Sequence, residues 1–388
     1  MTATFLSGKT RAIGFRKEQI KKLGFLVQDN EDRFAEALEK DLGRPKGETL
    51  FGETSVMKVS QTCDLGSDRQ NEVLNWLLIA RQAHVNETYS SLDGWAKPQG
   101  VKGGFLWMAA APRTVPVPKG TTLVVSPWNF PISLALGPVL ASIAAGNTVI
   151  LKPAEQTPNL SNLLAELFPQ YLDPSAYRVV LGAVDEVTRL LQLPLDHIFF
   201  TGAGKVGKIV AHAAVEQSCP FTLELGGKSP ALVFADCDFY KTARRLMWGK
   251  WTNSGQICIA PDFALCDSAE TEAKLVEAIK QVIAEFEGDK GPAIDGPDYT
   301  SIINKAHYAR VAKLIDETKG TIVINGGRNE PKLKIGTTVV TNVKEDDILM
   351  EGKPAAVRDA ERGCMLTGGL PCSCRRDFRS RVPCAGED

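Results

Sequence analysis

Residues 121–153 read TTLVVSPWNFPISLALGPVLASIAAGNTVILKP, and this stretch decides the fold class. A β-branched run, TTLVV, is followed by an apolar helical segment at 132–145, and a second short apolar run, TVILK, comes next. Short apolar strands that alternate with helices are typical of a parallel sheet covered by helices on both faces. The stretch therefore predicts an α/β fold with a doubly wound, Rossmann-type parallel sheet.

The same alternation continues after residue 153. It predicts a helix near 159–172, a strand at 177–182, a short helix at 185–192, a strand at 197–202 and a helix that starts near Val206. Parallel sheets of this kind bind ligands beyond the carboxyl ends of their strands. Those ends carry the sequences SPWNFP, KPAEQTP and TGAGKVG. We therefore expect any cofactor to lie among these three loops.

A second α/β unit is predicted from residue 226. SPALVFA, PDFALCD, TIVINGG and TTVVTNV have the composition of strands, and apolar residues at helical spacing mark an amphipathic helix over 275–286. We expect a cofactor domain at 1–225 and a second, catalytic domain at 226–351, followed by a divergent segment at 352–388.

The amino-terminal part is predicted to be helical. Apolar residues recur at helical intervals over 15–42, where DLGRP then ends the helix. Residues 70–96 are interpreted as helical with a loop at 85–92. Residues 98–118 are rich in Pro, Gly and short apolar runs, which favours a hairpin arm used for oligomerisation rather than a part of a core.

Bulk composition excludes several classes of protein. The chain has 388 residues, enough for about two domains, and 45 basic residues balance 46 acidic ones. No polybasic face indicates nucleic acid or an anionic membrane as partner, and no apolar run is long enough to span a membrane. The four histidines show no metal-ligand spacing, so no metal is expected. The nine cysteines have no disulfide spacing through residue 266 and no signal sequence is present, which predicts a cytoplasmic protein.

One glycine-rich turn matches a dinucleotide-binding fingerprint. Gly202, Ala203 and Gly204 follow an apolar strand, and Gly207 completes the pattern as the next helix opens. Glycines let backbone N–H groups approach a pyrophosphate at the positive end of a helix, although a plain tight turn also explains the pattern. Glu224 follows Gly202 by 22 positions and would suit a ribose ligand by count. A phosphate-binding P-loop is excluded, because its first glycine would fall on Thr222.

Five polar or reactive residues each allow a structural and a functional interpretation. Cys258, in TNSGQICIAP, is a core sulfur or a nucleophile. Glu224, in TLELGGKSP, is a hydrogen-bonded structural residue or a general base whose pKa is raised by partial desolvation. Asn129 belongs to an ordinary turn or donates to an oxyanion. Lys152 and Glu155 form a strand end and helix cap, or a pair that holds a ribose.

Five motifs taken together favour the functional interpretation of these residues. The chain contains five ordered motifs that resemble the aldehyde dehydrogenase superfamily: SPWNFP, LKPAEQTP, FFTGAGKVG, LELGGKSP and GKWTNSGQICIAP. The subgroup they are most similar to contains fatty aldehyde and dimeric class 3 enzymes. The start of the chain agrees with it, since TFLSGKTRAIGFRKEQIKKL and the DLGRP that follows resemble the amino-terminal helices of this subgroup. Cys258 follows Glu224 by 34 positions and Asn129 by 129, both close to the family's intervals. The resemblance covers residues 4–350.

This resemblance implies a reaction and a role for each matching residue. Cys258 corresponds to the nucleophile, Glu224 to the base that hydrolyses a thioester, and Asn129 to the donor that stabilises the oxyanion. The implied activity is oxidation of a medium- or long-chain aliphatic or aromatic aldehyde to its acid. Trp251 stands where the family usually has Phe, a mild departure.

The resemblance also implies a cofactor site for NAD, with NADP left open. Lys152 and Glu155 match the positions that bind the adenosine ribose, and this frees Glu224 for chemistry. The remaining positions in the implied cofactor site are Trp128, Gly202, Ala203, Gly204 and Gly207.

The resemblance ends near Glu351, which is followed by Gly-Lys-Pro where the family has Ile-Phe-Gly-Pro. We expect the family's carboxyl-terminal part, which includes the strand that joins the subunits of a homodimer, to be replaced after a changed reading frame or a retained intron. Residues 352–388 contain four cysteines, which suit a disordered tail better than a metal cluster. Two hypotheses follow: an active aldehyde dehydrogenase, or an inactive remnant that at most binds nucleotide.

Overall fold

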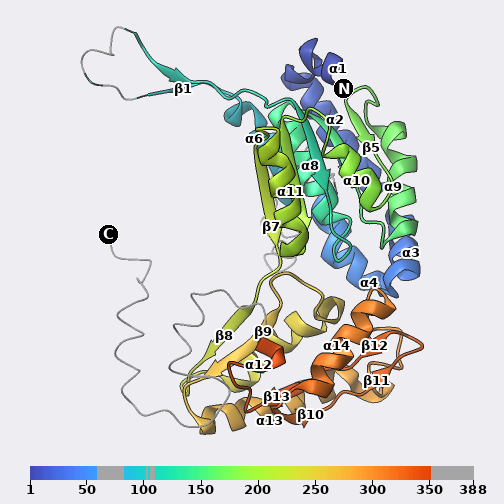
Figure 1. The fold of residues 1–388 in the computed structure, drawn as a ribbon, viewed down its shortest axis with the longest axis vertical. Coiled ribbons are helices and arrows are strands. Elements are labelled where there is room, and N and C mark those ends of the chain that lie inside the picture. The colour runs from blue at the N-terminus through green and yellow to red at the C-terminus, as the bar shows by residue number, and fades with distance from the viewer. Residues whose placement is uncertain (59–82, 102–103, 105–109, 351–388) are drawn as a thin grey trace, which may run out of the picture. The chain divides into compact units, whose positions relative to one another are not determined.

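The computed structural model describes residues 1–58, 83–101, 104 and 110–350. The chain divides into two compact units, unit 1 at Met1–Leu225 and unit 2 at Gly226–Asp388 (Figure 1). The segment at 352–388 lies outside the described residues, and so do residues 70–82 of the helical region expected at 70–96. No helix in the described part of the chain is long and apolar enough to cross a membrane.

Unit 1 is built around a five-stranded parallel sheet with the order β5-β4-β3-β6-β7. The strands are β3 (Thr121–Val125), β4 (Thr148–Lys152), β5 (Tyr177–Val179), β6 (His197–Gly202) and β7 (Phe221–Leu225). This confirms the predicted α/β fold with a parallel sheet.

Helices cover both faces of this sheet. Leu123, Ile150 and Phe200 pack on the face covered by α10 (Val184–Leu190) and α11 (Gly204–Glu216). Helices α8 (Ser133–Ala145) and α9 (Pro158–Tyr171) also contact the sheet, and both contact α2 (Ile13–Gln28). Because successive side chains of a strand point to opposite faces, the apolar runs of β3 and β4 are buried on both sides.

Helix α8 and the strand after it show why the opening stretch folds this way. Ile132, Leu136, Val139 and Ile143 are all buried, so one apolar side of α8 faces the core. The helix ends at Gly146, whose φ of 88° lies in the left-handed region that glycine adopts without a steric penalty. The chain then reverses directly into β4.

The amino-terminal helices differ from the prediction in one respect. The expected single helix over 15–42 is two helices, α2 and α3 (Glu31–Leu42). Asn30 leaves helical geometry at φ −120°, and its side-chain amide donates to the carbonyl of Leu26 at 3.0 Å. Short polar side chains compete in this way with helix continuation. The remaining short helices are α1 (Thr2–Leu6), η1 (Lys9–Arg11), α4 (Lys46–Thr49), η2 (Leu50–Thr54) and η3 (Ser55–Met57).

The loop expected at 85–92 is wrong, because these residues lie inside helix α6 (Ala83–Trp95). Val85 and Leu92 are both buried, and α6 packs against α2 and α8. The polar sequence between those two residues forms the exposed side of an amphipathic helix, so tertiary packing overrides the local composition.

The arm expected at 98–118 contains a short antiparallel pair. Strand β1 (Gln99–Gly100) pairs with β2 (Arg113–Thr114), with Gln99 opposite Thr114. Residues 102–103 and 105–109 are not among the described residues. A role of this arm in oligomerisation stays a prediction.

The sheets of unit 2 have two strands each. Strand β8 (Ser229–Val233) pairs in parallel with β9 (Pro261–Cys266), and helices α12 (Phe239–Trp251) and α13 (Ala269–Glu287) share their core. The other elements are η5 (Thr252–Gly255), η6 (Gly288–Lys290), α14 (Lys305–Glu317), β10 (Thr321–Ile324), β11 (Arg328–Asn329), β12 (Lys334–Ile335), β13 (Val339–Thr341) and η7 (Ile348–Met350). β10 pairs with β13 and β11 with β12, both antiparallel.

Candidate active site

Three predicted site loops meet at one edge of the unit 1 sheet. Strands β4, β3 and β6 are direct neighbours, with Val125 in register with both Lys152 and Phe200. The chain passes from β3 outward to β4 and β5, and then returns to β6 on the other side of β3. In open parallel sheets the ligand crevice lies at such a reversal of strand order. The loops at 126–131, 153–157 and 203–204 therefore lie at the edge where a ligand is expected.

The predicted pair Lys152–Glu155 is formed in the structure. The ammonium group of Lys152 donates to Oε2 of Glu155 at 2.5 Å, and Lys152 is only 2% exposed whereas Glu155 is exposed. The Ser126 N–H donates to the Lys152 carbonyl at 3.1 Å, which joins two of the loops. The Ser126 hydroxyl is buried without a hydrogen-bond partner among the described residues. A hydroxyl, an ammonium donor and a carboxylate acceptor together fit the hydroxyl groups of a ribose.

The glycine turn is sterically constrained at two positions and open at a third. A Cβ at Gly202 would lie 2.7 Å from Cζ of Phe200, and one at Gly207 would lie 2.8 Å from Cδ2 of Leu225. A Cβ at Gly204 would meet no atom within 4 Å. Gly207 thus allows α11 to pack closely on β7, and Gly202 leaves room for the Phe200 ring of its own strand, while the open space lies over the first turn of α11. Ala203, which precedes that turn, is its N-cap residue.

Asn129 and Trp128 lie in the loop between β3 and α8, and both side chains are half-buried. The backbone carbonyl of Asn129 accepts a hydrogen bond from Nη2 of Arg44 at 2.5 Å. The Asn129 side chain is therefore attached to a loop whose backbone is held by a residue from the amino-terminal helices.

Sequence reasoning did not identify Arg44 or its partner Glu53. They form a buried ion pair, and Oε2 of Glu53 accepts from the N–H groups of Ile132 and Ser133 at 2.7 and 3.1 Å. Burial raises the pKa of Glu53, while Arg44 and the two N–H groups oppose that rise. The only signal in the sequence is a charged residue on each side of a short helix, which does not reveal burial against a loop 79 positions away.

Cys258 follows a strained loop in unit 2. Asn253, Ser254 and Gly255 have φ values of 52°, 52° and 71°. Non-glycine residues rarely adopt a positive φ. Two such residues in succession persist only when surrounding contacts hold the backbone in place. The Cys258 side chain is exposed, which does not support its interpretation as an ordinary core residue.

Gln256 and Trp251 supply the contacts that hold this loop. The Gln256 amide donates to the carbonyls of Asn253 and Ser301, both at 3.0 Å, and its oxygen accepts from the Ile303 N–H at 3.1 Å. The Trp251 ring makes edge contacts with Phe286 and Tyr299, with centroids 5.4 and 5.1 Å apart. The Ser254 hydroxyl also donates to the carbonyl of Thr300.

Glu224 lies in β7, an edge strand, opposite Thr201 of β6. Its side chain is exposed, which does not support the partial desolvation considered for it as a general base. An edge strand has a neighbour on one side only, which explains how an apolar sequence can carry an accessible carboxylate. Glu224 and Asn129 belong to unit 1 and Cys258 to unit 2, so the structure describes these residues within separate units.

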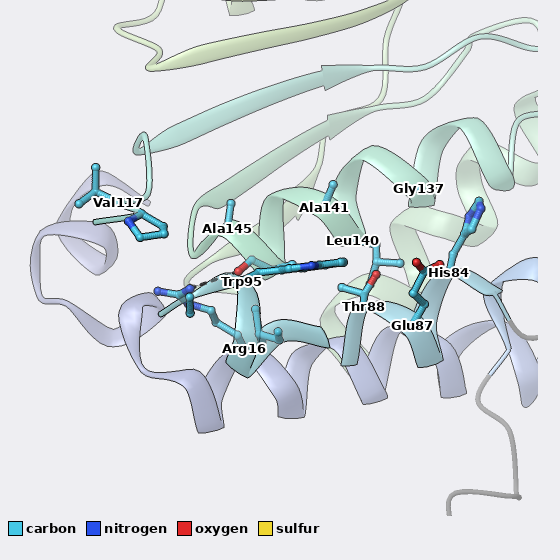
Figure 2. A pocket seen from close by; sticks show the side chains of 14 residues that line it. Arg16, His84, Glu87, Thr88, Trp95, Val117, Gly137, Leu140, Ala141 and Ala145 are labelled. Carbon is cyan, nitrogen blue, oxygen red and sulfur yellow. Dashed lines mark hydrogen bonds between the residues drawn. The ribbon is translucent and has the colours of Figure 1, made fainter. Parts of the chain in front are cut away.

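A cavity of about 530 Å³ in unit 1 contains none of the predicted site residues. It lies among α2, α6 and α8, and Figure 2 shows Val117 at one end of its lining and His84 at the other. The Arg16 guanidinium at its wall donates to the carbonyls of Thr10, Arg11 and Ala144, which assigns it a structural role. No group of three or more His, Cys, Asp or Glu that could hold a metal occurs in the described part of the chain.

Comparisons with known proteins connect these features to one family. A sequence model described as "Aldehyde dehydrogenase family" matches residues 5–352. The chain is 37% identical over 350 residues to aldehyde dehydrogenase family 3 member H1 of Arabidopsis thaliana, covering 89% of this chain and 67% of that protein. It is 38% identical to family 3 member B1 of Bos taurus, with 89% and 68% covered. The chain thus spans about two thirds of the length of these relatives.

Solved structures agree with the fold. A substrate-bound aldehyde dehydrogenase of Staphylococcus aureus superposes with a TM-score of 0.80 at 29% identity, covering 98% of this chain and 81% of that one. A Mycobacterium tuberculosis aldehyde dehydrogenase in complex with NAD+ superposes with a TM-score of 0.72 at 24% identity, with 91% and 69% covered. At that identity the second likeness shows the fold alone.

Proposed function

Because the chain belongs to the aldehyde dehydrogenase family, we propose that it oxidises an aldehyde to the carboxylic acid with NAD or NADP as hydride acceptor. The observation that carries the proposal is the exposed Cys258 behind a strained, well-anchored loop within the matched region. The proposed substrates are medium- or long-chain aliphatic and aromatic aldehydes.

The first proposed step is attack by Cys258. Its thiolate adds to the carbonyl carbon, and the carbonyl oxygen becomes the oxyanion of a thiohemiacetal. The Asn129 side-chain amide and the Cys258 backbone N–H act as the oxyanion donors. One such donor is typically worth about 3 to 4 kcal/mol. A bound nicotinamide cofactor supplies the acceptor for the hydride that leaves this carbon, which becomes a thioester carbonyl.

The second proposed step is hydrolysis with Glu224 as general base. Its carboxylate removes a proton from water, the hydroxyl adds to the thioester, and the C–S bond breaks to release the acid and the Cys258 thiolate. The accessible position of Glu224 in β7 suits contact with water. A base at this position favours hydrolysis over transfer of the acyl group to coenzyme A.

The cofactor is assigned to the carboxyl edge of the unit 1 sheet. Lys152 and Glu155 are proposed to hold the adenosine ribose, and the backbone at the start of α11 is proposed to hold the pyrophosphate. The Glu155 carboxylate would repel a 2′-phosphate, which favours NAD, whereas the adjacent Lys152 ammonium would attract one. The two charges therefore act in opposite directions on the choice between NAD and NADP.

A second candidate is nucleotide binding without turnover. The observation that favours it is the exposure of large apolar side chains in unit 2, among them Leu232, Phe234 and Trp248. Exposed apolar surface of this kind promotes association between molecules rather than catalysis.

The two candidates are separated by following NADH formation from NAD and a medium-chain aldehyde. Cys258→Ala is the test variant, and Cys237→Ala is the matched control, because Cys237 is another free cysteine of unit 2. Sustained turnover that is lost only in Cys258→Ala supports the proposed enzyme. A single burst shows attack and hydride transfer without hydrolysis by Glu224. No NADH from a folded protein that still binds NAD favours the second candidate.

A further inference from the structure

We propose that Arg44 and Glu53 are positioning residues that fix the backbone around Asn129, and this inference rests on the proposed function. Neither residue belongs to the five ordered motifs of the resemblance, although Arg44 lies in the DLGRP segment near the start of the chain. Arg44 lies between α3 and α4, and Glu53 lies in η2. Both reach the loop between β3 and α8 from the amino-terminal part of unit 1.

Both charged residues of this pair are buried, which requires an explanation. Arg44 is 1% exposed and Glu53 is fully buried. Removing two charges from water costs several kcal/mol for each ion, and a buried pair often stabilises a fold no better than an apolar pair of the same volume. Stability alone is therefore a weak explanation for the burial of this pair. The hydrogen bonds that the pair makes with other residues indicate its role.

Glu53 holds the end of the loop. One carboxylate oxygen pairs with Arg44, and the other accepts from the N–H groups of Ile132 and Ser133, where α8 begins. The N-cap residue of α8 is Ile132, and its side chain makes no capping hydrogen bond. Glu53 satisfies these backbone donors instead, and its negative charge at a helix N-terminus is favourable.

Arg44 holds the middle of the loop. Its Nη2 donates to the Asn129 carbonyl at 2.5 Å, and the guanidinium lies over the Phe130 ring with 5.0 Å to the centroid. Its Nε lies 3.8 Å from a carboxylate oxygen of Glu48. The guanidinium therefore has contacts on several sides and little freedom to move.

Together the two residues fix the backbone at Asn129 and again three positions later. An oxyanion donor is effective only if it is aimed before the reaction begins, because reorientation during the reaction weakens the stabilisation. The Arg44–Glu53 pair supplies this orientation through the backbone. The inference assigns no contact with substrate to either residue.

The test replaces the pair without leaving one charge unpaired. The variant Arg44→Met with Glu53→Leu removes both charges and retains apolar volume. The matched control is Arg33→Met with Glu166→Leu, an exposed bidentate ion pair of the same unit. Should the first double variant not fold, Arg44→Lys keeps the charge and loses the forked geometry.

The first measurement is amide hydrogen exchange of Ile132 and Ser133. We expect exchange to accelerate at least about tenfold in the pair variant, because both amides lose their hydrogen bond to a charged acceptor. The control variant is expected to exchange like the wild type at these amides. Unchanged exchange in the folded pair variant would overturn the inference, with or without enzymatic activity.

The second measurement is a double-mutant cycle with Asn129→Ala. Misplacement of a reacting group by about 1 Å can cost about 10²-fold, so we expect a fall in kcat of that order from the pair variant. In the Asn129→Ala background the same replacement is expected to change kcat less than about twofold. Equal losses in both backgrounds would show that the pair acts otherwise than through Asn129, which overturns the inference.

The two arms separate failure of this inference from failure of the proposed function. A wild-type protein without Cys258-dependent NADH formation refutes the proposed function, and hydrogen exchange still decides whether the pair fixes the loop. If the wild type is active but the pair variant changes neither the amide exchange of the loop nor kcat, only the inference is refuted.

Discussion

Strands β3 and β4 of unit 1 are buried along their whole length, whereas in unit 2 β8 is fully buried only at Val233 and β10 is largely exposed. In unit 1 five parallel strands have helices on both faces. In unit 2 the strands occur in pairs, and Leu232, Phe234, Ile322 and Val323 remain accessible.

The difference shows which unit can form a stable core with the described residues. An isolated two-stranded pair is marginal in water and needs a packed helix or further strands. The core shared by α12, α13 and the β8–β9 pair supplies such packing, but Leu232 of β8 is still 47% exposed. We therefore expect unit 1 to be the more stable unit, and the following experiments challenge that ranking in order of decreasing effect.

The largest effect is expected from truncating the core of unit 1. Leu123→Ala in β3 removes a side chain with 0% exposure and should destabilise unit 1 by about 2–5 kcal/mol in urea unfolding. The matched change Leu232→Ala in β8, where the side chain is 47% exposed, should cost within about 1 kcal/mol. Equal losses would contradict the difference between the two sheets.

A smaller effect is expected from the buried Asp347 of unit 2. Burial raises the pKa of its carboxyl group, but the N–H groups of Leu349 and Lys319 and the Thr318 hydroxyl lower it more, so the pKa lies below its ordinary value. A lowered pKa stabilises the folded state above about pH 4, and the contribution is lost as the pH falls through the folded-state pKa.

Asp347→Asn tests this contribution. It should destabilise unit 2 by about 1–3 kcal/mol at neutral pH, since a charged acceptor is lost from a buried site. The gap from the wild type should close in acid. Urea unfolding at several pH values measures the gap, and a pH-independent difference would be the contrary result.

Hydrogen exchange compares the two units within one molecule. Amides of β3 and β4 should exchange at least about tenfold more slowly than those of β8 and β9, because local opening is easiest where few apolar contacts are buried. Faster exchange in β3 than in β8 would reverse the ranking. Residues inside helices serve as internal references.

The smallest effect is expected at Trp251. Trp251→Phe keeps an aromatic ring near Phe286 and Tyr299 and should cost about 0.5–1.5 kcal/mol in unit 2. Trp248→Phe, three positions earlier and 61% exposed, is the control and should have no measurable effect on urea unfolding. A larger loss at Trp248 would show that the exposed side of α12 is packed in solution.

Much of unit 1 could be predicted because its signals are local. The β-branched runs at 121–125 and 148–152 and the apolar helix between them determine each other's burial. The Lys152–Glu155 pair was also accessible to sequence reasoning, since its members lie three positions apart.

The features that could not be predicted depend on distant neighbours. Arg44 meets Asn129 across 85 positions, and no local pattern encodes that contact. The exposure of Glu224 follows from the place of β7 at the edge of the sheet, which is a property of strand order. The loop expected at 85–92 was wrong because α2 and α8 bury the apolar side of α6.

The three left-handed residues in front of Cys258 make this loop a point where selection for stability and selection for activity oppose each other. A glycine at Ser254 would adopt the observed backbone without strain, but it would remove the hydroxyl that ties the loop to Thr300. Directed evolution toward heat resistance would therefore favour a substitution four positions before Cys258, the proposed nucleophile. A gain in stability at this position would therefore come at the expense of the hydrogen bond that fixes the shape of the loop.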